Sequence, residues 1–191
     1  MKIDRHDQAK ILSSSEIVQL FTEGFKTERD RALFGLCLYC GLRISEACTM
    51  HTRGAYRISG GVRGRITVRK ENTKGKADTR SIPVCDELRE ILEAYSSPKE
   101  FLFPGRWGRG HIHPDSADKI LRAAFDELDI EGASTHSFRR TCLTKMHLSH
   151  VPTKVIKKIS GHKTLAALDR YLEVTDEDLQ DGVNTLKFRA Y

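Results

Sequence analysis

The stretch of sequence that says most about the fold is His136-Ser137-Phe138-Arg139-Arg140-Thr141. Helical periodicity continues beyond it, and we expect one helix over residues 135–148. On that helix His136 and Arg139 are three residues apart and therefore share a face. Such a pair is more often solvated than functional, so the pair alone identifies no chemistry.

Two further segments carry side chains of the same kinds. One is Gly41-Leu42-Arg43-Ile44-Ser45-Glu46-Ala47, in which a glycine ends one helix and an arginine opens the next. The other contains Gly161 at the end of a helix, His162 in the following turn and Tyr171 nine residues later. Each segment is a weak signal by itself. Together, two arginines, two histidines, a tyrosine and a basic loop form a set that suits phosphate chemistry.

The rest of the chain is mostly helical in its pattern. Residues 56–84 differ, because glycines interrupt them and polar and apolar residues alternate, which predicts a small antiparallel sheet with a basic loop. The expected fold class is therefore α+β, mostly helical, with one small sheet. Further helices are expected at 13–21, 27–40, 44–50, 86–95, 115–128, 153–160, 164–172 and 176–186.

Composition limits the class of protein. The chain has 191 residues, of which 39% are hydrophobic and 30% charged. This fits one domain, or one domain with a short arm, and is too apolar for a disordered chain. The apolar runs are too short to span a bilayer and the N-terminus does not resemble a secretory signal, so we expect no membrane association and a cytoplasmic location.

The five cysteines are scattered and odd in number, which favours free thiols in a reducing compartment. Cys37 and Cys40 form a CxxC pair, but no second pair completes a zinc site. We therefore interpret both as packing residues of a buried helix, and we expect no metal site.

The net charge of +6 is held in two blocks. Residues 51–80 contain nine basic and two acidic side chains, and residues 136–172 contain eight and one, so each block carries +7. Two such blocks on one surface would bind an anionic partner. A solvated basic surface without a partner fits the charge alone almost as well.

Taken together, these segments resemble the catalytic domain of the tyrosine recombinases, the family that includes the phage integrases. The matching pieces occur in family order at 41–46, 73–76 with 82–83, 136–141, 159–162 and Tyr171. The 26-residue step from His136 to His162 and the nine-residue step to Tyr171 also match. The resemblance covers the chain from about residue 13 to the end, and it implies the family's catalytic fold with a small three-stranded antiparallel sheet.

The resemblance implies a role for the matching tyrosine and arginines. Tyr171 would attack a DNA phosphate and form a 3′-phosphotyrosyl link. Arg43 and Arg139 would hold the non-bridging oxygens, whose charge grows in the five-coordinate transition state. Because the link conserves the energy of the phosphodiester, rejoining to a second strand would need neither a cofactor, such as ATP, nor a metal.

The remaining matching residues would move protons or bind the phosphate. Lys74 would protonate the departing 5′-oxygen, and Lys76 in the same loop is the alternative lysine. His136 would assist proton transfer with Tyr171, and His162 would hydrogen-bond the phosphate.

The resemblance also implies double-stranded DNA as the partner, met at the nucleoid. We expect a homo-tetramer on DNA and a monomer when free. Residues 1–12 would be an arm or linker, 13–175 the catalytic domain, and 176–191 a tail helix. This helix either docks on a neighbouring protomer, or it packs on its own domain or is frayed. Expected contacts to DNA come from basic side chains, namely Lys76, Arg80, Arg140, Lys154, Lys157, Lys158 and Lys163.

Two other functions fit part of the pattern. A type IB topoisomerase shares the tyrosine chemistry but only relaxes supercoils, and a DNA-binding regulator would have lost catalysis. The complete residue set argues against the regulator, which has no need of Tyr171. Typical family members also carry an N-terminal helical domain, so the roughly twelve residues before the first helix suggest either a trimmed or a naturally short recombinase.

Overall fold

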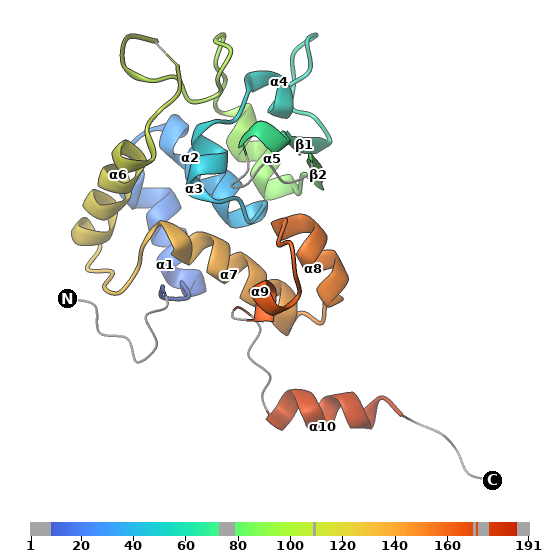
Figure 1. Cartoon of the computed structure of the whole chain (residues 1–191). Helices are drawn as coiled ribbons and strands as arrows, with labels where there is room; N and C mark the ends of the chain where they lie inside the picture. Colours follow the sequence, from blue (N-terminus) through green and yellow to red (C-terminus); the bar gives the residue numbers. More distant parts are fainter. Residues whose placement is uncertain (1–8, 73–78, 109, 170, 172–175, 187–191) are drawn as a thin grey trace.

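The structure is a computed structural model that describes residues 9–72, 79–108, 110–169, 171 and 176–186 (Figure 1). Every predicted helix is present, and α7 and α8 have the predicted bounds. The elements are α1 Ser14–Gln19, the π-helical turn η1 Leu20–Gly24, α2 Glu28–Tyr39, α3 Ile44–Cys48, α4 Thr52–Ala55, β1 Arg65–Val68, the 3₁₀ turn η2 Lys70–Asn72, β2 Arg80–Pro83, α5 Asp86–Glu93, the 3₁₀ turn η3 Arg106–Gly108, α6 Pro114–Glu127, α7 Thr135–Leu148, α8 Thr153–Ser160, α9 Ala166–Asp169 and α10 Asp176–Asn184.

Helix α2 lies at the centre of the fold. Its apolar run 32–38 is buried on all sides, and the helix packs against α3, α5 and α7. The ring of Phe34 stacks on Phe25 and on Phe138, with centroid separations of 4.7 and 5.5 Å. Phe138 belongs to α7, so this aromatic contact anchors α7 against α2 and brings the next residue, Arg139, beside the end of α2.

The sheet has two strands rather than the three that we expected. β1 and β2 are antiparallel, with Ile66 opposite Ile82. Within the described residues, the segment 56–64 between α4 and β1 forms only an isolated bridge between Tyr56 and Val62. The two glycines at 60–61 have φ values of 89° and 76°, so the chain turns back after one bridge and no ladder develops.

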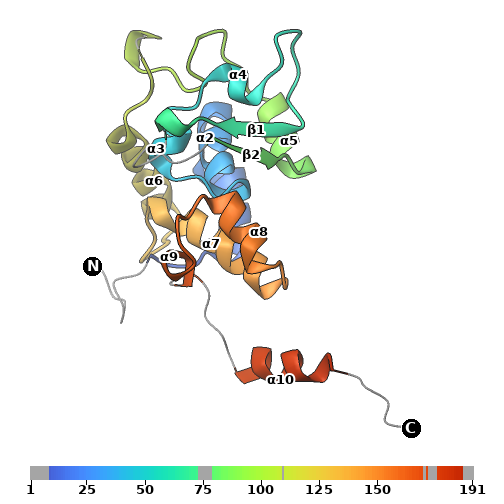
Figure 2. The same ribbon diagram turned by 45° about the vertical axis from the view of Figure 1, so that its right-hand side comes forward.

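The predicted tail helix is present as α10. Figures 1 and 2 show it lying apart from the other elements. Its apolar side chains Leu179 and Val183 are exposed, as is Leu186 just beyond its end. Across the part of the chain that the structure describes, no helix is both long and apolar enough to cross a membrane.

All five cysteines are free thiols. Cys37, Cys40, Cys48 and Cys142 are buried, whereas Cys85, the N-cap of α5, is exposed. Burial of Cys37 and Cys40 confirms that they are packing residues. Among the described residues, no group of three or more His, Cys, Asp or Glu side chains is arranged to hold a metal ion.

Candidate active site

Arg43 is positioned by the break between α2 and α3. Gly41 has a φ of 57°, in the left-handed region, and it stops α2 just after the C-cap residue Cys40. Arg43 is the N-cap of α3, and its backbone N–H donates to Glu46 Oε2 at 2.9 Å. The predicted stop and restart of the helix is thus confirmed, and the Arg43 side chain, 28% exposed, remains accessible.

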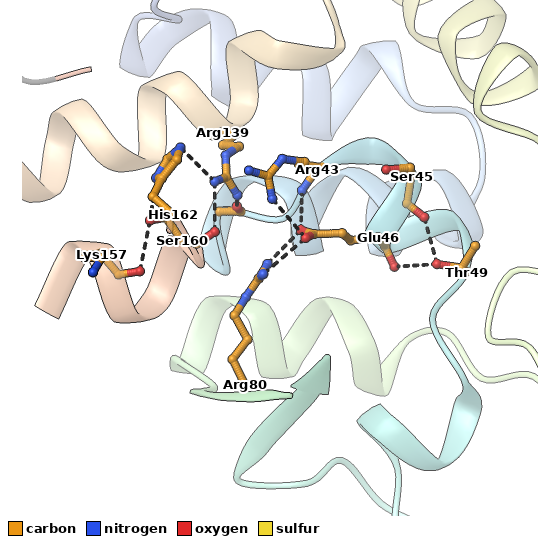
Figure 3. A network of polar contacts seen from close by, with 10 residues as sticks. Arg43, Ser45, Glu46, Thr49, Arg80, Arg139, Lys157, Ser160 and His162 are labelled. Atoms are coloured by element: carbon orange, nitrogen blue, oxygen red, sulfur yellow. Dashed lines mark hydrogen bonds and ion pairs between the residues drawn. The ribbon is translucent and has the colours of Figure 1, made fainter. Parts of the chain in front are cut away.

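Arg139 is held inside the protein by three acceptors from two separate segments (Figure 3). Its side chain comes from α7 and the residue is 2% exposed. One Nη1 N–H donates to the carbonyl of Gly41. Nη2 donates to the carbonyl of Ser160 at 2.8 Å and lies 3.2 Å from Nε2 of His162. The guanidinium therefore joins the end of α2 to the end of α8.

His162 lies in the turn that follows α8. Gly161 ends that helix with a φ of 69°, as the sequence predicted. Because arginine can only donate, Nε2 of His162 accepts from Arg139, which places the ring proton on Nδ1. Nδ1 lies 2.8 Å from Oγ of Ser160, whose hydroxyl donates in turn to the carbonyl of Lys157 at 3.3 Å. This chain of hydrogen bonds fixes the orientation of the imidazole ring.

Glu46 connects two arginines, and sequence reasoning assigned it no role. Its carboxylate is completely buried and accepts from Arg43 Nη1 at 3.1 Å. It also accepts from Nη1 and Nη2 of Arg80 at 3.1 and 2.7 Å. The sequence signal was its capping position three residues after Arg43. Arg80 is 8% exposed and both of its Nη atoms bind Glu46, so its predicted contact with DNA stays a prediction that this arrangement does not favour.

The charges in this cluster favour an anionic ligand. Burial, followed by repulsion from Arg139, Arg43 and Arg80, lowers the pKa of His162 to about 4, so the ring is neutral at pH 7. Burial alone would raise the pKa of Glu46, but Arg80 and then Arg43 lower it below its ordinary value. Three guanidinium groups and one carboxylate leave a net charge of +2. A phosphodiester gains a second negative charge in a five-coordinate state, which this cluster would balance.

Tyr171 lies next to His162, after α9. The centroids of the two rings are 5.3 Å apart and the rings are tilted by 40°. The tyrosine is partly buried against a small apolar cluster whose members include Leu143 and Leu168. Thr144 Oγ1 of α7 donates to its backbone carbonyl at 3.3 Å. The structure therefore brings Tyr171 to the same place as the histidine nine residues before it.

Comparison with known proteins identifies the family. The sequence pattern of the Phage integrase family matches residues 10–178. The chain belongs to the phage integrase family. It is 31% identical over 181 residues to a tyrosine recombinase of Pseudothermotoga lettingae, a match that covers 92% of this chain and 60% of that protein. The chain thus spans less than two thirds of this integrase relative.

Solved structures of the integrase family share the fold. The catalytic domain of bacteriophage HP1 integrase superposes with a TM-score of 0.68 at 21% identity, covering 94% of this chain and 96% of that domain. The XerH site-specific recombinase bound to its difH substrate superposes with a TM-score of 0.71 at 16% identity, covering 94% of this chain and 55% of XerH. At these identities the likeness concerns the fold, and it confirms the predicted fold class.

Among the described residues, one further predicted catalytic residue, His136, is not part of the polar cluster. The side chain of His136 is exposed on the first turn of α7, one turn before Arg139. Lys74 and its alternative Lys76 both lie outside the described residues. The roles of these three side chains remain predictions.

The expected DNA contacts on α7 and α8 differ in exposure. Arg140 Nη1 donates to the carbonyl of Ala9 at 2.7 Å, so this arginine holds the N-terminal segment. Of the lysines, Lys154, Lys158 and Lys163 are exposed and Lys157 is partly buried. Exposed ammonium groups can reach a phosphate backbone, and these four contacts stay predictions.

Proposed function

We propose that the chain is the catalytic part of a site-specific DNA recombinase, which cleaves and rejoins DNA through a covalent link to Tyr171. The observation that carries the proposal is the meeting of Arg43, Arg139, His162 and Tyr171, which come from three separate segments of the chain. Membership of the integrase family supports the same reaction. The family match over residues 10–178 supports 13–175 as the catalytic unit.

In the proposed reaction, the phenolic oxygen of Tyr171 attacks the phosphorus atom of a DNA phosphodiester. A bond forms between this oxygen and phosphorus while the bond from phosphorus to the 5′-oxygen breaks. The 5′-oxygen takes a proton, for which Lys74 or Lys76 is the proposed donor, and His136 assists removal of the tyrosine proton. The product is a 3′-phosphotyrosyl link and a free 5′-hydroxyl group.

The arginines would act when charge develops on the phosphate. Arg43 is accessible and Arg139 is fixed by three acceptors, so each can offer N–H groups to the non-bridging oxygens without first becoming ordered. Attack by a 5′-hydroxyl group from a second strand then reverses the step and joins new partners. The number of phosphodiester bonds is unchanged, so the proposed exchange needs no ATP.

The proposed partner is double-stranded DNA. The XerH structure holds its difH substrate, and its fold is the fold of this chain. The exposed lysines Lys154, Lys158 and Lys163 would add contacts to the DNA backbone. A protein with this substrate would work at the nucleoid, in the cytoplasm.

We also propose that recombination occurs in a homo-tetramer. The exposed side chains Leu179, Val183 and Leu186 lie on and just beyond α10, at helical spacing. Burial of these side chains against a neighbouring protomer would be favourable, at about 25 cal/mol per Å² of apolar surface. Concentration-dependent sedimentation with and without DNA would test this assembly.

Covalent trapping tests the proposed function. The protein would be mixed with nicked duplexes taken from DNA flanking its own gene, in EDTA, and analysed on a denaturing gel. A shifted band that disappears in Tyr171→Phe is expected. Strand transfer to a second duplex would then distinguish a recombinase from a topoisomerase that only relaxes DNA. DNA binding without any adduct would instead favour a regulator.

A further inference from the structure

Arg80 has an unusual position for a basic side chain in a block of charge +7. It is the first residue of β2, and it is 8% exposed. Its guanidinium forms a bidentate contact with Glu46, in which Nη1 donates to Oε1 at 3.1 Å and Nη2 donates to Oε2 at 2.7 Å. This is the geometry in which arginine binds a carboxylate most strongly. Arg80 therefore ties the sheet to helix α3.

The carboxylate that Arg80 holds is the same one that orients Arg43. Glu46 Oε1 lies 3.1 Å from Nη1 of Arg43 and 3.1 Å from Nη1 of Arg80. Glu46 Oε2 accepts from the backbone N–H of Arg43 at 2.9 Å and from Nη2 of Arg80 at 2.7 Å. Both oxygens are thus shared by the two arginines. A shift of Arg80 would move Glu46 and, with it, the side chain of Arg43.

Arg80 also lies against the end of α8. A Cβ atom added at Gly161 would be 2.3 Å from Nη1 of Arg80 and 3.0 Å from its Cζ atom. The absence of a side chain at Gly161 therefore makes room for the guanidinium, directly before His162. In Figure 3, Arg80 rises from the sheet toward Glu46, below Arg43 and Arg139.

Stability alone does not explain this placement. Among the described residues, Nε of Arg80 is buried without a hydrogen-bond partner. Leaving a buried donor without an acceptor is a net cost to folding. Buried ion pairs of this kind are often no more stabilising than well-packed apolar residues. A role in positioning other side chains explains why Arg80 is buried although its Nε–H group has no hydrogen-bond acceptor.

We propose that Arg80 is a positioning residue. Through Glu46 it fixes the orientation of the Arg43 side chain, and it holds that side chain in place relative to the end of α8. The inference rests on the proposed function, because Arg43 is the group that would hold the phosphate. Arg80 itself does not touch the phosphate. Along the sequence, it is the first strand residue after the segment that contains Lys74 and Lys76.

The first test follows Arg43 directly and requires no DNA. The Nε–H signal of Arg43 in a proton–nitrogen NMR spectrum is identified as the signal lost in Arg43→Lys. In Arg80→Lys we expect this signal to shift or broaden, because a lysine cannot meet both oxygens of Glu46. Arg122→Lys is the matched control, since Arg122 is exposed and donates to Asp118 on its own helix. An unchanged Arg43 signal in Arg80→Lys would overturn the proposal.

The second test uses single-turnover cleavage of the nicked duplexes flanking the gene, at saturating protein. Arg80→Lys should slow cleavage by about tenfold to a hundredfold, with little change in DNA affinity, because misplacement by about 1 Å can cost a hundredfold. Adding Arg80→Lys to Arg43→Lys should slow cleavage little further, since both changes act through one side chain. The proposal would be overturned if the effects of the two substitutions on the cleavage rate were fully additive, or if Arg80→Lys cleaved at the normal rate.

The two tests separate the inference from the proposed function. If the unchanged protein forms no adduct, the proposed function fails, and the NMR signal still decides whether Arg80 positions Arg43. If Arg80→Lys does not fold, Arg80→Gln replaces it in both tests. Failure of both variants to fold, with Arg122→Lys folded, would assign Arg80 to stability and overturn the proposal.

Discussion

Nη2 of Arg139 lies 3.2 Å from Nε2 of His162, and the imidazole accepts this hydrogen bond. In the free protein the lone pair of Nε2 is therefore already used by the arginine. For Nε2 to donate a hydrogen bond to a phosphate oxygen, its hydrogen bond with Arg139 must break and Nε2 must gain a proton. Under the proposed function, a bound phosphate would offer Arg139 a stronger acceptor, and binding of the substrate would then be coupled to release of His162.

The neutral state of His162 predicts a pH-dependent stability. Its ordinary pKa of 6.5 is lowered to about 4 in the folded protein, chiefly by burial. Between these values the unfolded chain binds a proton that the folded chain does not, so the free energy of unfolding falls as the pH decreases from 6.5 to 4. At about 1.4 kcal/mol per pKa unit, the loss is on the order of 3 kcal/mol. Urea denaturation across this range measures it.

His162→Gln should flatten this dependence, because its amide oxygen can accept from Arg139 without titrating. His150→Gln is the matched control, since His150 is exposed. An equally steep loss of stability in His162→Gln and in the unchanged protein would contradict the prediction.

Tyr171→Phe should abolish the covalent adduct and leave DNA affinity nearly unchanged. The substitution removes only the phenolic oxygen, and the ring can still pack against the apolar cluster near Leu143 and Leu168. A denaturing gel and a fluorescence-anisotropy titration measure the two properties separately. An adduct that persists in the variant would place the nucleophile at another residue.

Arg43→Lys should reduce cleavage by at least about a hundredfold, as expected for loss of one preorganised donor in the transition state. The planar guanidinium of arginine can contact Glu46 and two phosphate oxygens at the same time. A lysine has a single ammonium group and cannot reproduce this geometry. Single-turnover cleavage rates at saturating protein measure the effect. A rate close to that of the unchanged protein would remove Arg43 from the site.

Glu46→Gln should destabilise the fold by about 3 kcal/mol or more, because it leaves buried guanidinium charge without its carboxylate. The equilibrium midpoint in urea reports this change. Glu127→Gln is the control, since Glu127 forms an exposed pair with Lys26, and such pairs contribute about 1 kcal/mol or less. Similar midpoints for the two variants would show that the buried pair is not needed for stability.

Local signals in the sequence predicted much of the fold. Gly41 and Gly161 mark the ends of α2 and α8 through their left-handed backbone, and α8 therefore ends at the predicted residue. The third strand was predicted wrongly, because the paired glycines at 60–61 turn the chain before a ladder can form. The backbone conformation of these two glycines therefore outweighed the alternation of polar and apolar residues, which had indicated a strand.

The site was predicted in part. Arg43, Arg139 and His162 were found because each lies in a recognisable motif. The pair of Glu46 and Arg80 was missed because its members are 34 residues apart. In sequence, Arg80 is one of nine basic residues in a charged block, and nothing local distinguishes a buried arginine from a solvated one.

The distribution of thiols allows a fluorescent label to be attached at one defined position. Cys85 is exposed, and the other four thiols are buried. Burial raises the pKa of all five, so a maleimide dye at mildly alkaline pH would react where solvent reaches the sulfur. The dye would sit two residues beyond β2, at the opposite end of that strand from Arg80. The unsubstituted chain could thus carry one fluorophore that reports movement of the sheet when DNA is added.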